Sequence, residues 1–307
     1  MKQKKLQRIA VIDIGTNSTL LLVAEVENKI LNQVVYESQE ITRLGELTGK
    51  SRNLKPDAIS RTVDAIARFV SKAKSLDAQK IHLIATNAVR IAENGREFKQ
   101  AVMDKTQLPV TVLSGMQEAE ATYHGVLSGH KDNLGISLVI DCGGGSTELV
   151  FGSANDVMHK TSVGIGSAQL TEQFDKSNFM RPDEFAKMTV FLDRFYIRQL
   201  PVKIPSRRAF GVGGTITTLA AISLGLEKHD PTKINGHILS RTDIWNLVEK
   251  LRQLPDGERK QITGLPEKRA DTIVAGATIY ATLLNYLDVE DIIVSTRGVR
   301  YGVILNI

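Results

Sequence analysis

The segment that decides the fold is Leu138–Gly152, which reads LVIDCGGGSTELVFG. An apolar run ends in Asp141, a turn of glycine, serine and threonine follows, and a second apolar run comes after it, which is typical of strand, tight turn and strand. The earlier segment Val11–Val23 reads VIDIGTNSTLLLV and repeats this order, with Asp13 near the end of its first run. The repetition predicts a duplicated supersecondary unit and two domains with similar cores. Two unrelated hairpins that share common turn residues are the alternative.

The length of the chain also favours two domains. It has 307 residues, of which 42% are hydrophobic and 24% are charged, as is ordinary for globular proteins. One hydrophobic core rarely spans so many residues. The polar segment Ser128–Gly135 reads SGHKDNLG and is rich in turn formers, so we expect an N-terminal domain over residues 1–130 and a C-terminal domain over 131–307.

Targeting signals and cysteine usage indicate the compartment and the kind of metal. The basic start is followed by a short apolar run that ends in Asp13, which fits neither a signal peptide nor a membrane anchor, so we expect a cytoplasmic protein without membrane contact. Cys142 is the only cysteine, which excludes an internal disulfide and a cysteine-rich zinc site. Any metal would therefore be held mainly by oxygen, and the net charge of +5 favours an anionic partner.

Apolar periodicity predicts strands that alternate with helices, which is the pattern of α/β layers. We expect helices over residues 56–76, from Ser114 onward, and over 182–199, 215–224, 242–253 and 266–287, with further strands over 81–85, 109–113 and 291–294.

Three loops could offer clustered backbone N–H groups to a phosphate: Asp13–Ser18 (DIGTNS), Asp141–Thr147 (DCGGGST) and Gly211–Thr215 (GVGGT). Glycine lets the backbone approach an anion closely. Thr215 is expected to cap a helix whose N-terminus is itself an anion site. A plain tight turn is the alternative for each loop, but their joint occurrence favours phosphate. The candidate ligands are Gly15, Thr16, Asn17, Ser18, Gly143, Gly144, Gly145, Ser146, Thr147, Gly213, Gly214 and Thr215.

Two better-known phosphate motifs do not fit. A dinucleotide fingerprint places its glycines between a strand and a helix, whereas the first two loops here connect strand to strand. The segment Gly45–Ser51 reads GELTGKS and is similar to a Walker A loop, but three residues separate its glycines where four are required.

Acidic side chains flank the first two loops. Asp13, Asp141 and Glu148 would face the same anion as the N–H groups, and carboxylates repel phosphate unless a cation lies between them. Mg²⁺, or another divalent cation, suits a few carboxylates combined with phosphate oxygens and waters. The alternative is that these acids cap their own turns.

Two more side chains are candidates. Glu118 lies in the first turn of the helix opened by Ser114, with Gln117 placed to complete a capping box; acids favour helix N-termini for electrostatic reasons alone. Arg90 could clamp a phosphate with its two-pronged guanidinium, or lie on a helix surface.

Six motifs in order and spacing resemble the Ppx/GppA family of exopolyphosphatases and guanosine pentaphosphate phosphatases: DIGTNST, ATNAVR, SGMQEA, DCGGGSTEL, GVGGT and GLPEKRAD. The resemblance spans nearly the whole chain. It implies two ribonuclease-H-like α/β domains of the actin, heat-shock chaperone and sugar-kinase type, with the active site in an interdomain cleft. It also implies that Glu118 orients the attacking water, that Asp141 and Glu148 lie on the metal side, and that Arg90 and the glycine loops clamp the phosphate.

The resemblance implies a Mg²⁺-dependent exopolyphosphatase that acts on inorganic polyphosphate, with no nucleic-acid partner. The alternatives are hydrolysis of guanosine pentaphosphate (pppGpp), a sensor that binds (p)ppGpp or polyphosphate without catalysis, and a small-molecule kinase of the same fold. Many family members have arginine where Leu20 and Gln169 stand, and this departure bears on substrate preference. Many have glutamate where Gln117 stands, and the departures at Gln117 and Leu20 motivate the sensor alternative. A homodimer is implied by the resemblance alone.

Overall fold

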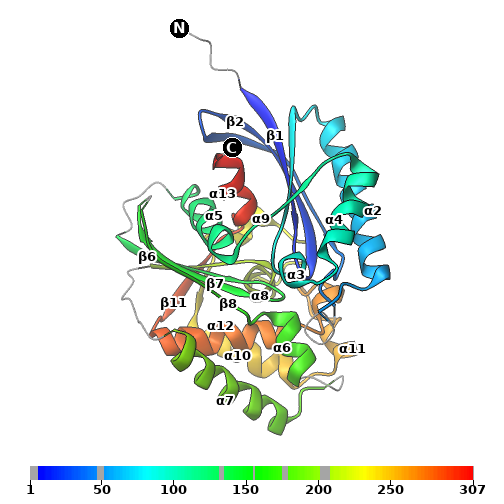
Figure 1. The fold of residues 1–307 in the computed structure, drawn as a ribbon. Coiled ribbons are helices and arrows are strands. Elements are labelled where there is room, and N and C mark those ends of the chain that lie inside the picture. The colour runs from blue at the N-terminus through cyan, green and yellow to red at the C-terminus, as the bar shows by residue number, and fades with distance from the viewer. Residues whose placement is uncertain are drawn as a thin grey trace. The chain divides into compact units, whose positions relative to one another are not determined.

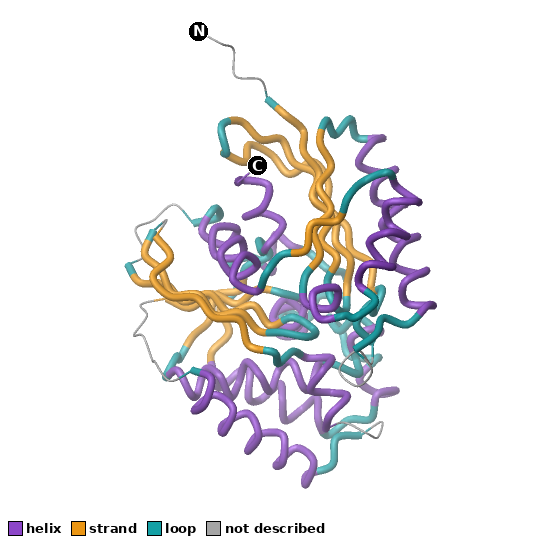
Figure 2. The backbone as a smooth tube through the Cα atoms, viewed as in Figure 1, coloured by secondary structure: helices purple, strands orange, loops and turns teal. Residues whose placement is uncertain are grey.

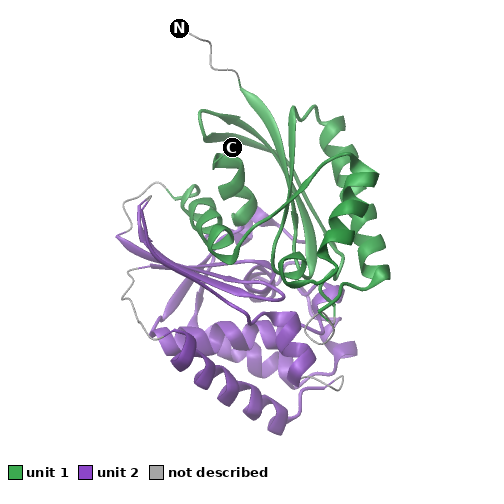
Figure 3. Ribbon diagram, viewed as in Figure 1, with its two compact units in different colours: residues 1–131, 297–307 green, residues 132–296 purple. Residues whose placement is uncertain are grey.

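The computed structural model describes residues 6–46, 52–130, 135–154, 156–174, 179–200 and 208–306. The chain divides into two compact units, coloured separately in Figure 3. Unit 1 comprises residues 1–131 and 297–307, and unit 2 comprises residues 132–296. Each unit has its own sheet and its own helices, as Figure 2 shows.

Unit 1 is built on a five-stranded sheet with the order β3-β2-β1-β4-β5. Its elements are β1 (Gln7–Ile14), β2 (Ser18–Glu27), β3 (Ile30–Ile41), α2 (Pro56–Ser75), β4 (Lys80–Ala85), α3 (Asn87–Ile91), α4 (Gly95–Thr106), β5 (Val110–Val112), α5 (Gly115–Leu127) and α13 (Val299–Asn306). Helices α2 and α4 cover one face of this sheet and α5 and α13 cover the other (Figure 1). Strand β1 is therefore buried on both faces, which explains its nearly continuous apolar sequence.

Unit 2 is built on a six-stranded sheet with the order β10-β11-β9-β6-β7-β8. Its elements are β6 (Ile136–Cys142), β7 (Thr147–Ser153), β8 (Asp156–Val163), α6 (Ser167–Phe174), α7 (Pro182–Gln199), β9 (Arg208–Val212), α8 (Gly214–Ser223), α9 (Pro231–Ile234), β10 (Ile238–Ser240), α10 (Arg241–Arg252), α11 (Asp256–Arg259), the 3-10 turn η1 (Glu267–Arg269), α12 (Ile273–Leu287) and β11 (Asp291–Val294). The core of this unit is one cluster, at whose centre lies α12, buried over most of its length.

The two sheets repeat one plan, as the sequence predicts. Read from β8, the second sheet has the same sequence of partners as the first: an antiparallel meander of three strands, then two parallel neighbours. The turns also match, because the N–H of Gly15 donates to the Ser18 carbonyl at 2.9 Å and that of Gly143 to the Ser146 carbonyl at 3.0 Å. The α/β fold with two ribonuclease-H-like units is thus confirmed.

The last helix differs from the predicted domain division. Residues 297–307, expected in the C-terminal domain, belong to unit 1 because α13 packs against α5 and β1. Glycines make this packing close: a Cβ atom added at Gly302 would lie 1.7 Å from the carbonyl oxygen of Ala121. The division near residue 131 falls partly on residues 131–134, which lie outside the described residues.

Two helix starts also differ from the prediction. The helix expected from residue 266 begins at Ile273, after the separate turn η1. Thr215 is not the cap of α8. Gly213 holds that position with a φ of +92°, a conformation that costs glycine nothing, so the helix starts one residue earlier than expected. No helix among the described residues is long and apolar enough to cross a membrane.

Candidate active site

The candidate residues of unit 1 follow the carboxyl ends of three parallel strands. After β1 comes the turn Gly15–Ser18, after β4 comes α3 with Arg90, and after β5 comes α5 with Glu118. Backbone bonds tie the strand ends together, from Thr86 N–H to the Ile14 carbonyl at 3.2 Å and from Leu113 N–H to the Ala85 carbonyl at 2.9 Å. In open α/β sheets, ligands bind outside this edge.

Glu118 is held in the first turn of α5 by a complete capping box. The Ser114 N–H donates to Gln117 Oε1 at 2.9 Å, and the Gln117 N–H donates to Ser114 Oγ at 3.2 Å, as the sequence predicts. Glu118 itself is 8% exposed. A carboxylate is rarely buried to this extent without a partner.

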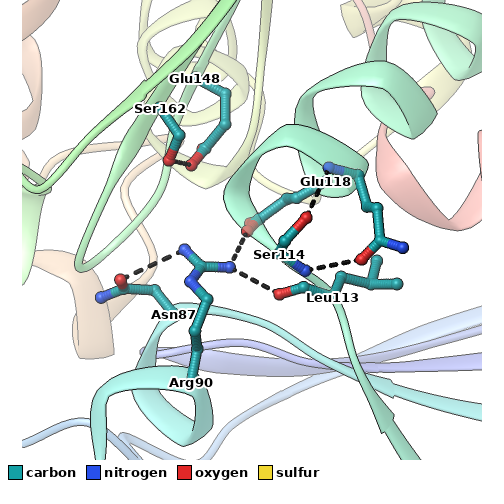
Figure 4. A network of polar contacts seen from close by, with 8 residues as sticks. Asn87, Arg90, Leu113, Ser114, Glu118, Glu148 and Ser162 are labelled. Carbon is teal, nitrogen blue, oxygen red and sulfur yellow. Dashed lines mark hydrogen bonds and ion pairs between the residues drawn. The ribbon is translucent and has the colours of Figure 1, made fainter.

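The partner of Glu118 is Arg90 (Figure 4). Arg90 Nη1 lies 2.9 Å from Glu118 Oε2 and also donates to the Leu113 carbonyl at 2.9 Å, while Nη2 donates to Asn87 Oδ1 at 3.3 Å. The guanidinium therefore orients the Glu118 carboxylate. The sequence predicted that Arg90 contacts phosphate and did not predict this contact with Glu118.

Burial raises the pKa of Glu118 above its usual value, and the hydrogen bond and positive charge of Arg90 oppose part of this rise. A carboxylate with a raised pKa is a better proton acceptor than an ordinary glutamate. The environment of Glu118 thus suits a general base, and its fixed orientation suits the alignment of a water molecule.

The Gly15–Ser18 turn has backbone donors left over. In the described part of the chain, the N–H groups of Thr16 and Asn17 donate to no other residue. Asp13 precedes this turn and is 8% exposed. Its neighbours in the sheet register are Leu20 and Ile84, so the strand positions beside it are apolar.

The glycine loops of unit 2 also follow parallel strands. The loop Gly143–Ser146 follows β6, and Gly213 follows β9. A Cβ atom at Gly213 would lie 2.8 Å from Asp141 Oδ1, so both loops meet at the Asp141 carboxylate. The close approach and the positive φ at Gly213 both require glycine.

The carbonyl oxygens of the second loop point toward α6. The N–H of Ser167 donates to Gly143 and the N–H of Ala168 to Gly144, both at 2.9 Å. Because the C=O and N–H of a trans peptide point in opposite directions, the following amides point away from α6. Among the described residues, no acceptor takes the N–H groups of Gly144–Ser146. This cluster of donors is suited to an anion. The Thr147 hydroxyl instead donates to the Ile165 carbonyl at 2.6 Å.

Two carboxylates lie side by side in unit 2. Asp141 and Glu148 are direct partners in the β6–β7 register, so they share one face of the sheet. Ser162 Oγ donates to Glu148 Oε1 at 2.7 Å (Figure 4). No group of three histidine, cysteine or acidic side chains in the described segments could hold a metal unaided. Two carboxylates that leave other positions to phosphate oxygens and waters fit Mg²⁺.

Arg269 lies beside the third glycine loop and is a candidate site residue that our sequence analysis did not name. A Cβ atom at Gly214 would lie 2.0 Å from Arg269 Nη1, so the guanidinium lies directly against the first turn of α8. Arg269 is half-buried, and the loss of hydration around its guanidinium lowers its pKa to about 10. The guanidinium and the positive end of the α8 dipole would both attract an anion bound at this turn. The run GLPEKRAD contains this arginine, but no spacing rule links it to the distant glycine loop.

The chain matches the model of the Ppx/GppA phosphatase family over residues 21–307. It belongs to that family. The Ppx/GppA chain is 32% identical over 313 residues to a bifunctional 3-dehydroquinate synthase/phosphatase of Fusobacterium nucleatum subsp. nucleatum, an alignment that covers 97% of the chain and 46% of that relative. The chain therefore spans about half the length of this relative. It is 28% identical over 318 residues to exopolyphosphatase 2 of Mycobacterium tuberculosis, with 98% of the chain and 99% of the relative covered.

Solved Ppx/GppA structures share the fold of this family member. The crystal structure of the Aquifex aeolicus family member has a TM-score of 0.83 at 32% identity, and covers 98% of this chain and 97% of its own. An exopolyphosphatase from Cytophaga hutchinsonii has a TM-score of 0.87 at 28% identity, with 98% of each chain covered. The structure describes each unit of the Ppx/GppA chain by itself, so the joint action of both sets of residues on one substrate stays a prediction.

Proposed function

We propose that this phosphatase is an exopolyphosphatase, which releases the terminal phosphate of inorganic polyphosphate by attack of water on the terminal phosphorus. The observation that carries the proposal is the buried, oriented Glu118 carboxylate at the same strand edge as a turn with donors left over. Phosphoryl transfer is catalysed mainly by positioning and by stabilisation of charge on the phosphate oxygens, and both are available here.

Glu118 accepts a hydrogen bond from the attacking water and aligns it with the scissile bond. Arg90 keeps the carboxylate in one orientation through the 2.9 Å contact to Oε2. The raised pKa of Glu118 increases its ability to take the proton as the phosphorus–oxygen bond forms.

The loops of unit 2 hold the phosphate oxygens. The N–H groups of Gly144–Ser146 and of the first turn of α8 donate to them, and Arg269 adds a positive charge beside that turn. Asp141 and Glu148 would hold Mg²⁺, which neutralises phosphate charge when bound. Ser162 fixes the Glu148 carboxylate for this role.

Inorganic polyphosphate is the favoured substrate because relatives similar over nearly their whole length are named exopolyphosphatases. The second candidate is the 5′-phosphate of pppGpp, which presents the same kind of phosphoanhydride. Both substrates would use the residues described above in the same roles.

The test is phosphate release from long polyphosphate, short polyphosphate, pppGpp and ATP, side by side, with Mg²⁺ and with EDTA. We expect the fastest release from polyphosphate, its loss in EDTA, and a fall of about 10²–10⁴-fold in Glu118→Gln, the usual contribution of a general base. Glu120→Gln is the matched control, since it changes the same group two residues along α5. Full activity of Glu118→Gln would remove Glu118 from the mechanism, and binding without turnover would favour a sensor.

A further inference from the structure

The segment Thr42–Gly45 is bound to the first glycine turn, although our sequence analysis set its last residue aside as part of a false Walker A motif. The N–H groups of Thr42 and Arg43 donate to the Asn17 carbonyl at 3.1 and 3.0 Å. The N–H of Gly45 donates to the Thr16 carbonyl at 2.9 Å. Most of the GELTGKS motif, residues 47–51, lies outside the described residues.

Gly45 also brings the segment close to α3. A Cβ atom at Gly45 would lie 2.3 Å from Thr16 Cγ2 and 3.2 Å from Ala88 Cβ. Ala88 is in the short helix that carries Arg90. The segment therefore packs between the anion-binding turn and the helix of the arginine that orients Glu118.

Arg43 has an unfavourable backbone conformation for its residue type. Its φ is +49°, in the left-handed region where residues other than glycine are uncommon. This conformation is what allows its own N–H and that of Gly45 to reach two successive carbonyls of the turn. Glycine would adopt it without cost, so the presence of arginine suggests that its side chain is needed at this position.

The charges near the Gly15–Ser18 turn favour an additional cation at this position. Asp13 and Glu118 both carry negative charge when ionised, and Arg90 is engaged with Glu118. A polyanion bound at the Gly15–Ser18 turn would thus meet a net negative charge from these three side chains. A second arginine, Arg43, whose backbone is bonded to the turn, brings the sum of these charges to zero.

We propose that Arg43 is a substrate-binding residue whose guanidinium donates hydrogen bonds to a phosphate group of the polyanion held at the Gly15–Ser18 turn. The inference rests on the proposed function. The planar fork of arginine matches two phosphate oxygens, and such charge-assisted hydrogen bonds are stronger than neutral ones. Lysine at this position would keep the charge but lose the paired donors.

The test compares Arg43→Gly with Lys29→Gly. Lys29 is also a cation with a positive φ, of +63°. It lies in the turn after the other end of β2, and the rise of an extended strand places it roughly 30 Å from Ser18. Both variants remove one positive charge and relieve one strained φ. We expect the melting temperature to stay equal or rise in both, and KM for polyphosphate to rise about tenfold or more in Arg43→Gly alone, as for the loss of hydrogen bonds to a charged group.

Binding gives a second readout that does not need turnover. In the Glu118→Gln background, the Kd for inorganic tripolyphosphate, measured by calorimetry, should rise about tenfold with Arg43→Gly and stay unchanged with Lys29→Gly. An unchanged Kd in Arg43→Gly, or equal losses in both variants, would overturn the inference. If the wild type releases no phosphate but Arg43→Gly still weakens binding, the proposed function fails and the role of Arg43 stands. If tripolyphosphate does not bind at all, both fail.

Discussion

Tyr280 connects the core of unit 2 to both of its glycine loops, and Tyr280→Phe is therefore an informative variant. Tyr280 extends from α12 and is fully buried. Its single hydroxyl proton faces two carbonyl oxygens, that of Val212 at 2.7 Å and that of Ile140 at 3.1 Å, and its oxygen accepts from the Cys142 N–H at 3.4 Å. Val212 and Cys142 end β9 and β6, directly before Gly213 and Gly143.

Loss of the hydroxyl leaves buried backbone groups with one partner fewer and creates almost no cavity. An unsatisfied buried group costs about 1–3 kcal/mol. For a domain of this size, this corresponds to a fall in Tm of about 2–4 °C for each kcal/mol. Burial raises the pKa of the Tyr280 phenol well above its usual value, so the hydroxyl stays protonated at neutral pH and the loss should be the same on either side of neutrality.

Tyr196→Phe is the matched control. Tyr196 is also buried in unit 2 and bonds to α12, through the Ile279 carbonyl at 3.3 Å and Thr282 Oγ1 at 3.2 Å, and neither of these two bonds is to a strand. We expect a similar fall in Tm from both variants, measured by calorimetry. KM for polyphosphate should rise in Tyr280→Phe alone, because only that hydroxyl holds the two loops in register. An equal KM in both variants would refute this positioning role.

Three further variants test other contacts. Arg90→Ala removes the hydrogen bond and the positive charge that lower the pKa of Glu118 and leaves the burial that raises it, so the pKa of Glu118 should rise further. Because Glu118 must be ionised to act as a base, a pH profile of kcat/KM should show activity lost at a higher pH on acidification than in the wild type. Gly214→Ala places a Cβ atom 2.0 Å from Arg269 Nη1 and must displace the guanidinium. Inhibition by orthophosphate should then weaken by about tenfold, as for the loss of a hydrogen bond to a charged group. Unchanged inhibition would exclude Arg269 from the site. Gly302→Ala forces α13 away from the Ala121 carbonyl and should cost about 1–3 kcal/mol of stability in urea unfolding, while Gly164→Ala, whose Cβ meets nothing within 4 Å, should cost little.

Local patterns predicted the elements that carry the site. The hairpins around Asp13 and Asp141, the capping box before Glu118 and the helix that starts at Pro56 all depend on neighbouring residues, so the sequence displays them directly. The edge strands β3 and β8 were missed because their side chains are mostly half-exposed and polar, which weakens the apolar alternation.

Contacts between distant segments were not predictable in this way. The return of α13 to unit 1, the packing of Arg269 against Gly214 and the bonds from Thr42–Gly45 to the first turn join residues far apart in the chain. Each is set by tertiary packing. A positive φ at an arginine, such as that of Arg43, leaves no mark in a sequence because arginine does not favour it.

The proposed chemistry predicts where the oxygen of water goes. The most direct measurement is hydrolysis of polyphosphate in ¹⁸O-labelled water, followed by mass spectrometry of the released orthophosphate and of the shortened polymer. If water oriented by Glu118 attacks the terminal phosphorus, each released phosphate carries one labelled oxygen and the polymer carries none. Label at the new end of the polymer, or unlabelled phosphate transferred to another acceptor, would contradict the account.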